Sequence, residues 1–234
     1  MEEFNKEQLE KSFSLLQKEL VGKTDLKNYV MIEKIRIISG IDLAYWEEDG
    51  SDYAVCCIVS IDYKTQEIVE IKHCVDKITV PYIAGYLSFR ELPLICKTYK
   101  LLDKKPDVAM FDGNGVLHYC NMGIATHASF QINIPTIGVA KSYLKVDGVD
   151  FTMPKDEVGC YSDIVIKNQV SGRALRTRKG VKPIFISCGN WIDLETTTKI
   201  VLSLVEHDSR LPVPTRLADI ETRKQRKALI KIKN

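Results

Sequence analysis

The sequence lacks the patterns that mark several common classes of protein. It contains no CxxC pair, and none of its seven cysteines lies beside a histidine at the spacing of a zinc site. It has no GxxxxGKS or GxxxxGKT motif, which argues against a nucleotide-dependent enzyme. No apolar run approaches the ~20 residues that span a bilayer, and the N-terminal MEEFNKEQLEK is too charged for a signal peptide. We therefore expect a cytoplasmic protein with reduced cysteines and no membrane association.

Length and overall charge set looser bounds. The 234 residues are 45% hydrophobic and 27% charged, so the chain can bury a large core, and we expect one domain over residues 1–234 that acts as a monomer. Apolar residues at helical spacing predict an N-terminal helix at about residues 5–20 that packs against the main body, and the tail from about residue 220 to 234 is strongly basic. The net charge of +2 is too small to indicate a nucleic-acid partner, so the local arrangement of charges matters more.

The most informative stretch of the chain lies between residues 107 and 144. A strand is predicted at residues 108–111 and ends in Asp112, with Gly113-Asn114-Gly115 directly after it. A second strand at residues 135–140 ends in Lys141, and a helical segment lies between the two strands. Ligands of such units bind beyond the carboxyl ends of the strands. Asp112 and Lys141 should therefore meet at one rim of a sheet.

Three further carboxylates could point to the same rim. Asp42 lies in the first strong strand, Ile35–Tyr45, where a buried aspartate is costly unless it is paired or binds a metal. Glu91 precedes Pro93 at the predicted start of a helix, and Asp219 lies near the predicted start of a last basic helix. Each carboxylate also has a simpler interpretation, as a turn residue, an acceptor of backbone hydrogen bonds or a charge at a helix start. Their convergence would favour a functional site.

Two other segments are candidates for contact with nucleic acid. Tyr82 and Ile83 lie between Pro81 and Gly85 in what is predicted to be an exposed tight loop, where they could fold back onto the core or enter a base stack. Five basic residues fall within ten positions, and they could form a solvated face or meet a phosphate backbone. They are Arg173, Arg176, Arg178, Lys179 and Lys182.

Clustered carboxylates repel one another unless cations lie between them. Mg²⁺ suits such a cluster because it prefers oxygen ligands and keeps waters that can be exchanged for a substrate phosphate. Two such ions could activate a water and stabilise the leaving oxygen of a phosphodiester. A long antiparallel hairpin at about residues 53–75, following a first strand that carries a carboxylate, predicts an α/β fold with a ribonuclease H-like mixed central sheet flanked by helices.

At this point the chain resembles the endonuclease V family over about residues 35–219. Six motifs carry the resemblance in order along the sequence: GIDLAY, PYIAGYLSFRE, DGNGVLH, GIATH, PTIGVAKS and LPVPTRLAD. The resemblance implies a DNA repair nuclease that uses Mg²⁺ or Mn²⁺. It implies recognition of deoxyinosine and other deaminated bases in DNA, and cleavage of the second phosphodiester bond 3′ to the lesion. The family usually reads PYIP where this chain reads PYIA, so Ala84 replaces a proline.

The resemblance also implies roles for individual residues. The metal ligands fall on Asp42 and Asp112, and Glu91 matches the third catalytic carboxylate. Asp219 matches a position that is Asp or His in the family, and Lys141 matches the lysine beside the scissile phosphate. The remaining implied catalytic residue is a histidine of the same rim, His118.

The same resemblance implies a wedge and a pocket for the extruded base. The wedge that enters the duplex falls on Tyr82 and Ile83. Glycines and small apolar residues should form the pocket, because they let backbone groups reach the edge of the base. These residues are Gly85, Leu87, Gly113, Gly123, Ile124 and Gly138.

Three alternatives stay open from the sequence. An inosine-specific endoribonuclease would carry the same motifs, because only contacts with the 2′-OH separate RNA from DNA. Another ribonuclease H-like nuclease, specific for a hybrid or a branched junction, would not need the PYIAGYLSFRE loop. A binding module without catalysis would not need all three main carboxylates. We expect DNA as the substrate.

Overall fold

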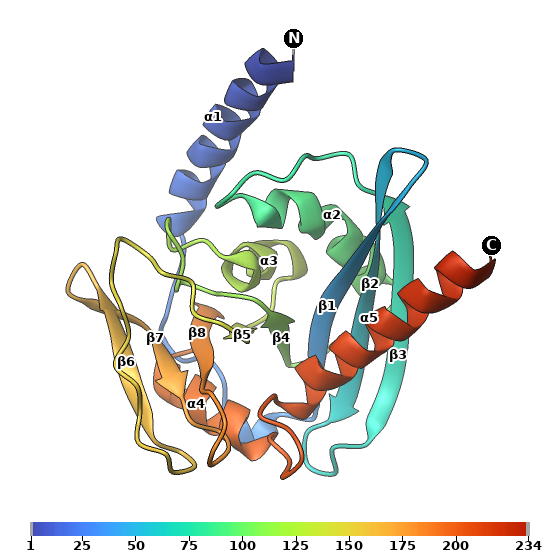
Figure 1. Cartoon of the computed structure of the whole chain (residues 1–234). Helices are drawn as coiled ribbons and strands as arrows, with labels where there is room; N and C mark the ends of the chain where they lie inside the picture. The colour runs from blue at the N-terminus through green and yellow to red at the C-terminus, as the bar shows by residue number, and fades with distance from the viewer. Residues whose placement is uncertain (1, 233–234) are drawn as a thin grey trace.

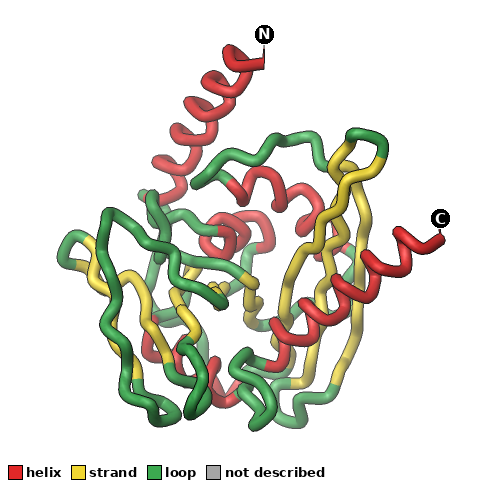
Figure 2. The backbone as a smooth tube through the Cα atoms, viewed as in Figure 1, coloured by secondary structure: helices red, strands yellow, loops and turns green. Residues whose placement is uncertain are grey.

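Eight strands form one mixed sheet in the computed structural model, which describes residues 2–232 (Figures 1 and 2). The strands lie in the order β3-β2-β1-β4-β5-β8-β7-β6. Their bounds are β1 Ile37–Glu48, β2 Ser51–Asp62, β3 Ile68–Lys77, β4 Val108–Asp112, β5 Thr136–Ala140, β6 Tyr161–Ile166, β7 Gln169–Leu175 and β8 Ile184–Asn190. The antiparallel pairing of β2 with β3 confirms the predicted hairpin.

Helices cover both faces of this sheet. Their bounds are α1 Glu2–Val21, α2 Leu87–Lys100, α3 Ile124–Ile132, α4 Leu194–Ser203 and α5 Val213–Ile232, with a short 3₁₀ turn at Ile32–Lys34. Side chains alternate between the two faces of a strand, so Ile41 and Phe111 pack with α2 and α3, whereas Ile38 and Met110 pack with α4 and α5. The sheet therefore has a hydrophobic core on each face.

The strands that position the candidate site are β1, β4 and β5, which are parallel and lie at the centre of the sheet. β1 pairs with β4 so that Ile41 lies opposite Phe111, and β4 pairs with β5 so that Asp112 lies opposite Val139. Asp42 and Asp112 follow Ile41 and Phe111, so the two carboxylates lie side by side on the α4/α5 face. Asp112 and Lys141 meet at one rim, as expected, because the Lys141 ammonium donates a hydrogen bond to Asp112 Oδ2.

The first turn of α5 lies directly against the backbone of β1. A Cβ atom added to Gly40 would lie 2.0 Å from the carbonyl oxygen of Pro214. Carbon and oxygen atoms cannot approach so closely, so this position of β1 has room only for glycine. The contact fixes where α5 crosses the sheet, and α5 carries Asp219.

Two predicted helix starts are wrong. α2 begins at Leu87 and contains Pro93 in its interior, so Glu91 lies one turn inside the helix. α5 begins at Val213, so Asp219 lies in its second turn, and the helix continues through the basic segment to Ile232. Residues 233–234 of the predicted tail lie outside the described residues.

Two members of the basic run are structural. Arg173 is 8% exposed and pairs with Asp163 and Glu195, each at 2.9 Å. Arg176 is 7% exposed and donates to backbone carbonyls, among them that of Pro154 at 3.2 Å. Neither guanidinium is available to a phosphate backbone, so the interpretation of this run as one nucleic-acid contact is wrong for these two residues.

α1 extends away from the rest of the molecule (Figure 1). The expected packing against the main body holds at Phe13 and at Gln17, whereas Leu15 is 69% exposed and Leu16 is 40% exposed. α1 is therefore attached along part of one side only.

Candidate active site

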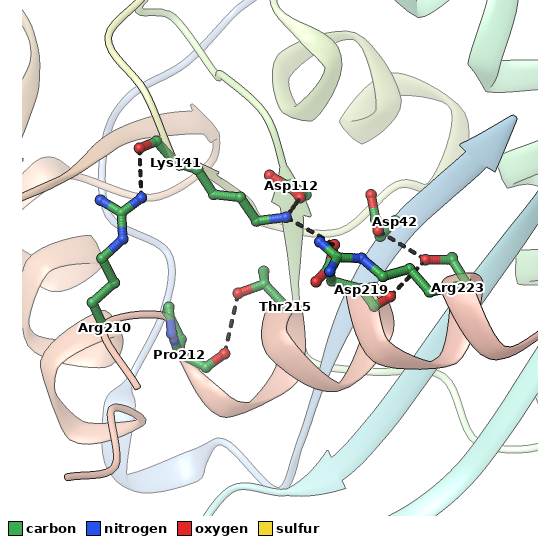
Figure 3. A network of polar contacts seen from close by, with 9 residues as sticks. Asp42, Asp112, Lys141, Arg210, Pro212, Thr215, Asp219 and Arg223 are labelled. Atoms are coloured by element: carbon green, nitrogen blue, oxygen red, sulfur yellow. Dashed lines mark hydrogen bonds and ion pairs between the residues drawn. The ribbon is translucent and has the colours of Figure 1, made fainter. Parts of the chain in front are cut away.

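Three carboxylates from three separate elements meet at the rim (Figure 3). One oxygen atom each of Asp42, Asp112 and Asp219 lies within 4.8 Å of the other two. β1 and β4 supply the first two residues, and the second turn of α5 supplies the third. Three close negative charges with only oxygen donors form a candidate site for a hard divalent cation. We call these three residues the carboxylate cluster.

Two cationic side chains contact the cluster. The Lys141 ammonium donates to Asp112 Oδ2 and, at 2.9 Å, to Asp219 Oδ1. The Arg223 guanidinium also donates to Asp219 Oδ1 at 2.9 Å, from one turn further along α5. Burial lowers the pKa of Lys141, but the hydrogen bonds and charges of Asp112 and Asp219 outweigh this effect and raise it above its usual value. Lys141 therefore stays charged and balances part of the negative charge of the cluster.

Asp42 is a partly buried carboxylate of the cluster with a raised pKa. Burial raises its pKa to about 6, and the charge of Asp112 acts in the same direction. The Thr222 hydroxyl, 3.0 Å from Asp42 Oδ2, opposes this shift by donating a hydrogen bond. Thr222 lies three residues after Asp219 on α5, and side chains at this spacing share one helix face.

Glu91 lies beside the cluster but is not one of its three members. It reaches the rim from α2, and its Oε1 accepts a hydrogen bond of 2.7 Å from the Tyr45 hydroxyl. Burial raises the pKa of Glu91 to about 7, and the charges of Asp42 and Asp112 add to the shift. Burial and Glu91 also raise the pKa of Tyr45, so its phenol keeps its proton.

A cavity of about 200 Å³ opens next to Asp112. Most of the residues expected to form the base pocket line it. These residues are Gly85, Leu87, Gly113, Gly123 and Ile124. His118, Ser88, Asn114 and Tyr82 also line the cavity, which we call the base pocket.

Gly138 has a different position from the one expected. It lies in β5 behind the pocket, where an added Cβ would lie 2.3 Å from the backbone nitrogen of Gly115. Gly138 therefore lets the Gly113–Gly115 turn approach the sheet, and it does not line the pocket. His118 does line it, and burial lowers the pKa of this imidazole to about 4, so the ring is neutral at neutral pH.

The loop before α2 separates the two expected wedge residues. Tyr82 is 67% exposed at the mouth of the base pocket, as a wedge requires. Ile83 is 5% exposed, so the expectation of an exposed side chain is wrong for Ile83. Ile83 anchors the loop to the core, and Tyr82 is the residue that is free to contact a substrate.

The sequence interpretation missed four polar residues of the rim: Tyr45, Arg90, Thr222 and Arg223. Thr222 and Arg223 follow Asp219 at helical spacings of three and four, so the helix period could have identified them. Arg90 directly precedes Glu91, and its guanidinium donates to the Val80 carbonyl oxygen and to Asp52, each at 2.7 Å. Arg90 thereby holds part of the loop at residues 78–86, which we call the wedge loop because it carries the expected wedge residues.

The raised pKa values predict how pH and metal act on stability. In the unfolded chain Asp42 and Glu91 should titrate near pH ~4. In the fold their pKa values are about 6 and about 7, so the protonated forms stabilise the fold. Without metal, stability should therefore fall as the pH rises from about 4 through about 7.

Mg²⁺ should raise the melting temperature more at pH 8 than at pH 5, because it binds ionised carboxylates in competition with protons. Differential scanning fluorimetry in EDTA and in Mg²⁺ at the two pH values measures this difference. Asp42→Asn should remove much of the Mg²⁺ effect. An equal Mg²⁺ shift at both pH values would contradict the coupling of metal binding to these carboxylates.

The chain matches known proteins over nearly its whole length. A family model described as Endonuclease V matches residues 18–220. An endonuclease V from Bacillus thuringiensis is 56% identical over 230 residues, which are 98% of each chain. No helix among the described residues is long and apolar enough to cross a membrane.

Solved structures agree with the sequence relatives. The crystal structure of endonuclease V from Bacillus subtilis has a TM-score of 0.93 and 52% identity, and the match covers 95% of this chain and 94% of that one. Endonuclease V of Ciona intestinalis, in complex with a DNA that contains an inosine followed by a ribo-adenosine, has a TM-score of 0.83 and 30% identity, covering 95% and 99%. The predicted α/β fold with a ribonuclease H-like sheet is confirmed. The chain belongs to the endonuclease V family of metal-dependent DNA repair nucleases.

Proposed function

We propose that this chain recognises deoxyinosine and other deaminated bases in DNA and hydrolyses the second phosphodiester bond 3′ to the lesion. The products are a 5′-phosphate and a 3′-hydroxyl end, and the metal is Mg²⁺, for which Mn²⁺ can substitute. The observation that carries this proposal is the position of the carboxylate cluster beside the base pocket, with Asp112 belonging to both. A base held in the pocket brings its own strand to the cluster.

The residues of the chain have separate roles in this proposal. Asp42, Asp112 and Asp219 hold the metal, which, when bound, lowers the pKa of a water and stabilises charge on phosphate oxygens. Lys141, whose side chain is 33% exposed, adds a positive charge beside the scissile phosphate. Glu91, beside the cluster, is positioned by Tyr45. His118 is neutral and forms part of the pocket wall.

Pocket chemistry supports selection of an extruded base. An enzyme that inspects a base inside a duplex must rotate it out of the stack and fill the gap. Gly113 and Gly123 line the pocket and have no side chains, so the edge of a base can approach the backbone there. Backbone donors and acceptors could distinguish the N1–H and O6 of hypoxanthine from the amino-bearing edge of adenine.

Tyr82→Ala should weaken binding to an inosine duplex about 5- to 100-fold, because stacking on one base contributes roughly 1–3 kcal/mol. The loss on an inosine single strand should be smaller, since less stacking has to be replaced. Fluorescence anisotropy in EDTA measures both affinities. Tyr29→Ala is a matched control, because Tyr29 is 62% exposed beside Asp107 and Pro135, away from the base pocket. Equal losses on both substrates would count against a wedge.

A cleavage assay tests the proposed function directly. A labelled duplex with one inosine should be nicked in Mg²⁺ or Mn²⁺ and stay intact in EDTA, and the same duplex with adenine should stay intact in all three. Mapping the product ends should place the cut at the second phosphodiester bond on the 3′ side of inosine. Cleavage of both duplexes at similar rates would refute lesion recognition.

Inosine RNA is the second candidate substrate. The related Ciona protein was crystallised with a ribo-adenosine directly after the inosine, so that family member accommodates a ribose next to the lesion. Matched DNA and RNA strands with one inosine each, assayed together, decide between the two substrates.

We infer that residues 1–234 act as one catalytic domain and as a monomer, because one chain supplies the whole cluster. Unpaired cysteines fit a cytoplasmic location.

A further inference from the structure

A partly buried hydrogen bond and aromatic contacts connect α1 to residues at the base pocket. Gln17 is 1% exposed, and its Nε2 donates to the carbonyl oxygen of Gly85 at 3.1 Å. The Phe13 ring, one turn earlier on the same helix face, stacks on Phe89 with centroids 3.9 Å apart and planes 12° apart. It also lies against Tyr86, with centroids 5.8 Å apart.

Both contacts lead to walls of the pocket. Gly85 lines the pocket and has a φ of +84°, a conformation that favours glycine. The rings of Phe89 and His127 are T-shaped, with centroids 4.8 Å apart, and His127 Nδ1 lies 2.8 Å from the Ser88 hydroxyl. Ser88 is itself a lining residue of the pocket. α1 therefore contacts one lining residue, Gly85, directly, and contacts a second, Ser88, indirectly through Phe89 and His127.

Attachment of α1 to the rest of the fold does not explain why the buried residue at position 17 is a glutamine. Burying a carboxamide is more costly than burying an apolar side chain of similar size, unless all its polar atoms are hydrogen-bonded. Gln17 Oε1 is buried and has no hydrogen-bond partner among the described residues. A methionine would fill similar space without this cost. What the glutamine adds is a donor aimed at one carbonyl of the wedge loop.

We propose that Phe13 and Gln17 are positioning residues for recognition of the extruded base, and that α1 thus acts as a brace for the base pocket. This inference rests on the proposed function. Neither residue lines the pocket. They act by fixing Gly85 and Phe89, and hence the separation of the wedge loop from the Gly113–Gly115 turn on the opposite wall. Both residues precede residue 18, where the match to the family model begins.

Three variants test the brace. Gln17→Met keeps the length of the side chain and removes the donor, and Phe13→Ala removes the stack. Leu15→Ala is the matched control, because Leu15 lies on α1 between the two residues and is 69% exposed. For each variant the affinities for an inosine duplex and for an adenine duplex are measured in EDTA, and their ratio gives the discrimination.

We expect discrimination to fall about 3- to 10-fold in Gln17→Met and in Phe13→Ala, which corresponds to the loss of about one hydrogen bond. Leu15→Ala should match wild type. The single-turnover nicking rate in Mg²⁺ at saturating enzyme should stay within about twofold of wild type in Leu15→Ala, because this exposed side chain contacts neither the pocket nor the carboxylate cluster. Wild-type discrimination in both Gln17→Met and Phe13→Ala would overturn the brace.

Hydrogen exchange measured by mass spectrometry separates this inference from the proposed function. Amides of residues 82–87 should exchange faster in Gln17→Met than in wild type or Leu15→Ala, whatever the substrate is. If wild type shows no preference for inosine, the proposed function fails, and the exchange of these amides then decides the brace by itself. Unchanged exchange in Gln17→Met would overturn it.

Discussion

Asp112→Asn should lose nicking by on the order of a hundredfold or more and still bind inosine DNA about as well as wild type in EDTA. The substitution keeps the shape of the side chain and removes one negative charge from the cluster. Removing one preorganised electrostatic group at a reacting centre costs a few kcal/mol of transition-state stabilisation. Asp112 also accepts a hydrogen bond from Lys141, so Asn would weaken the hold on the ammonium.

Binding should not fall in parallel with cleavage. A carboxylate without its metal repels a phosphate, so its neutralisation can even tighten the complex at low salt. Gel shift and nicking on the same preparation measure the two effects, and Asp103→Asn is a control, because the Asp103 side chain is 80% exposed and pairs with Lys72. Asp112 also lines the base pocket. Loss of the preference for inosine along with cleavage would mean that Asp112 helps to read the base.

Gly40→Ala should lower both stability and nicking, although Gly40 contacts neither metal nor substrate. The new Cβ would meet the Pro214 carbonyl at 2.0 Å, so the start of α5 must move away from β1. Overpacking of this kind costs about 1–3 kcal/mol, which is roughly 2–12 °C in melting temperature for a domain of this size. α5 carries Asp219 and Thr222, and a displacement of ~1 Å at a catalytic group can cost about a hundredfold in rate.

Calorimetry and single-turnover nicking check this prediction. Gly22→Ala is the matched control, because a Cβ at Gly22 would meet only the Glu19 carbonyl oxygen, at an ordinary 3.5 Å. Raising the Mg²⁺ concentration should recover part of the nicking activity of Gly40→Ala, because a site with weaker metal affinity is occupied only at a higher Mg²⁺ concentration. A Gly40→Ala protein with the stability and the rate of wild type would show that α5 can shift without affecting Asp219.

The carboxylates on strands were predictable because they depend on two simple regularities. Side chains alternate along a strand, and neighbouring parallel strands end at the same rim. The second rule places Asp112 at the rim, whereas Asp42 lies in the middle of β1 and comes beside Asp112 through the register of β1 on β4. Asp219 needed the register of α5 on the sheet, which is set by the contact of Gly40 with Pro214. The expected helix start therefore misplaced it within α5.

Contacts between distant segments account for the other errors. Pro93 suggested that α2 begins near Glu91, but packing of Ser88 against His127 and of Phe89 against Phe13 continues the helix back to Leu87. Arg173 is buried because Asp163 lies opposite it on β6. Neither strand pairing nor helix docking is encoded in the local pattern of charge and hydropathy. The sequence could therefore predict the rim but could not predict the surroundings of each basic side chain.

The order of synthesis gives the carboxylate cluster a further property. Asp42 is made early, whereas Asp219 belongs to α5, which leaves the ribosome after every other described element of the fold. Chains emerge at ~5–20 residues per second, so the sheet can form for several seconds with the cluster one ligand short. A nascent or truncated chain that ends before α5 therefore lacks the complete metal site.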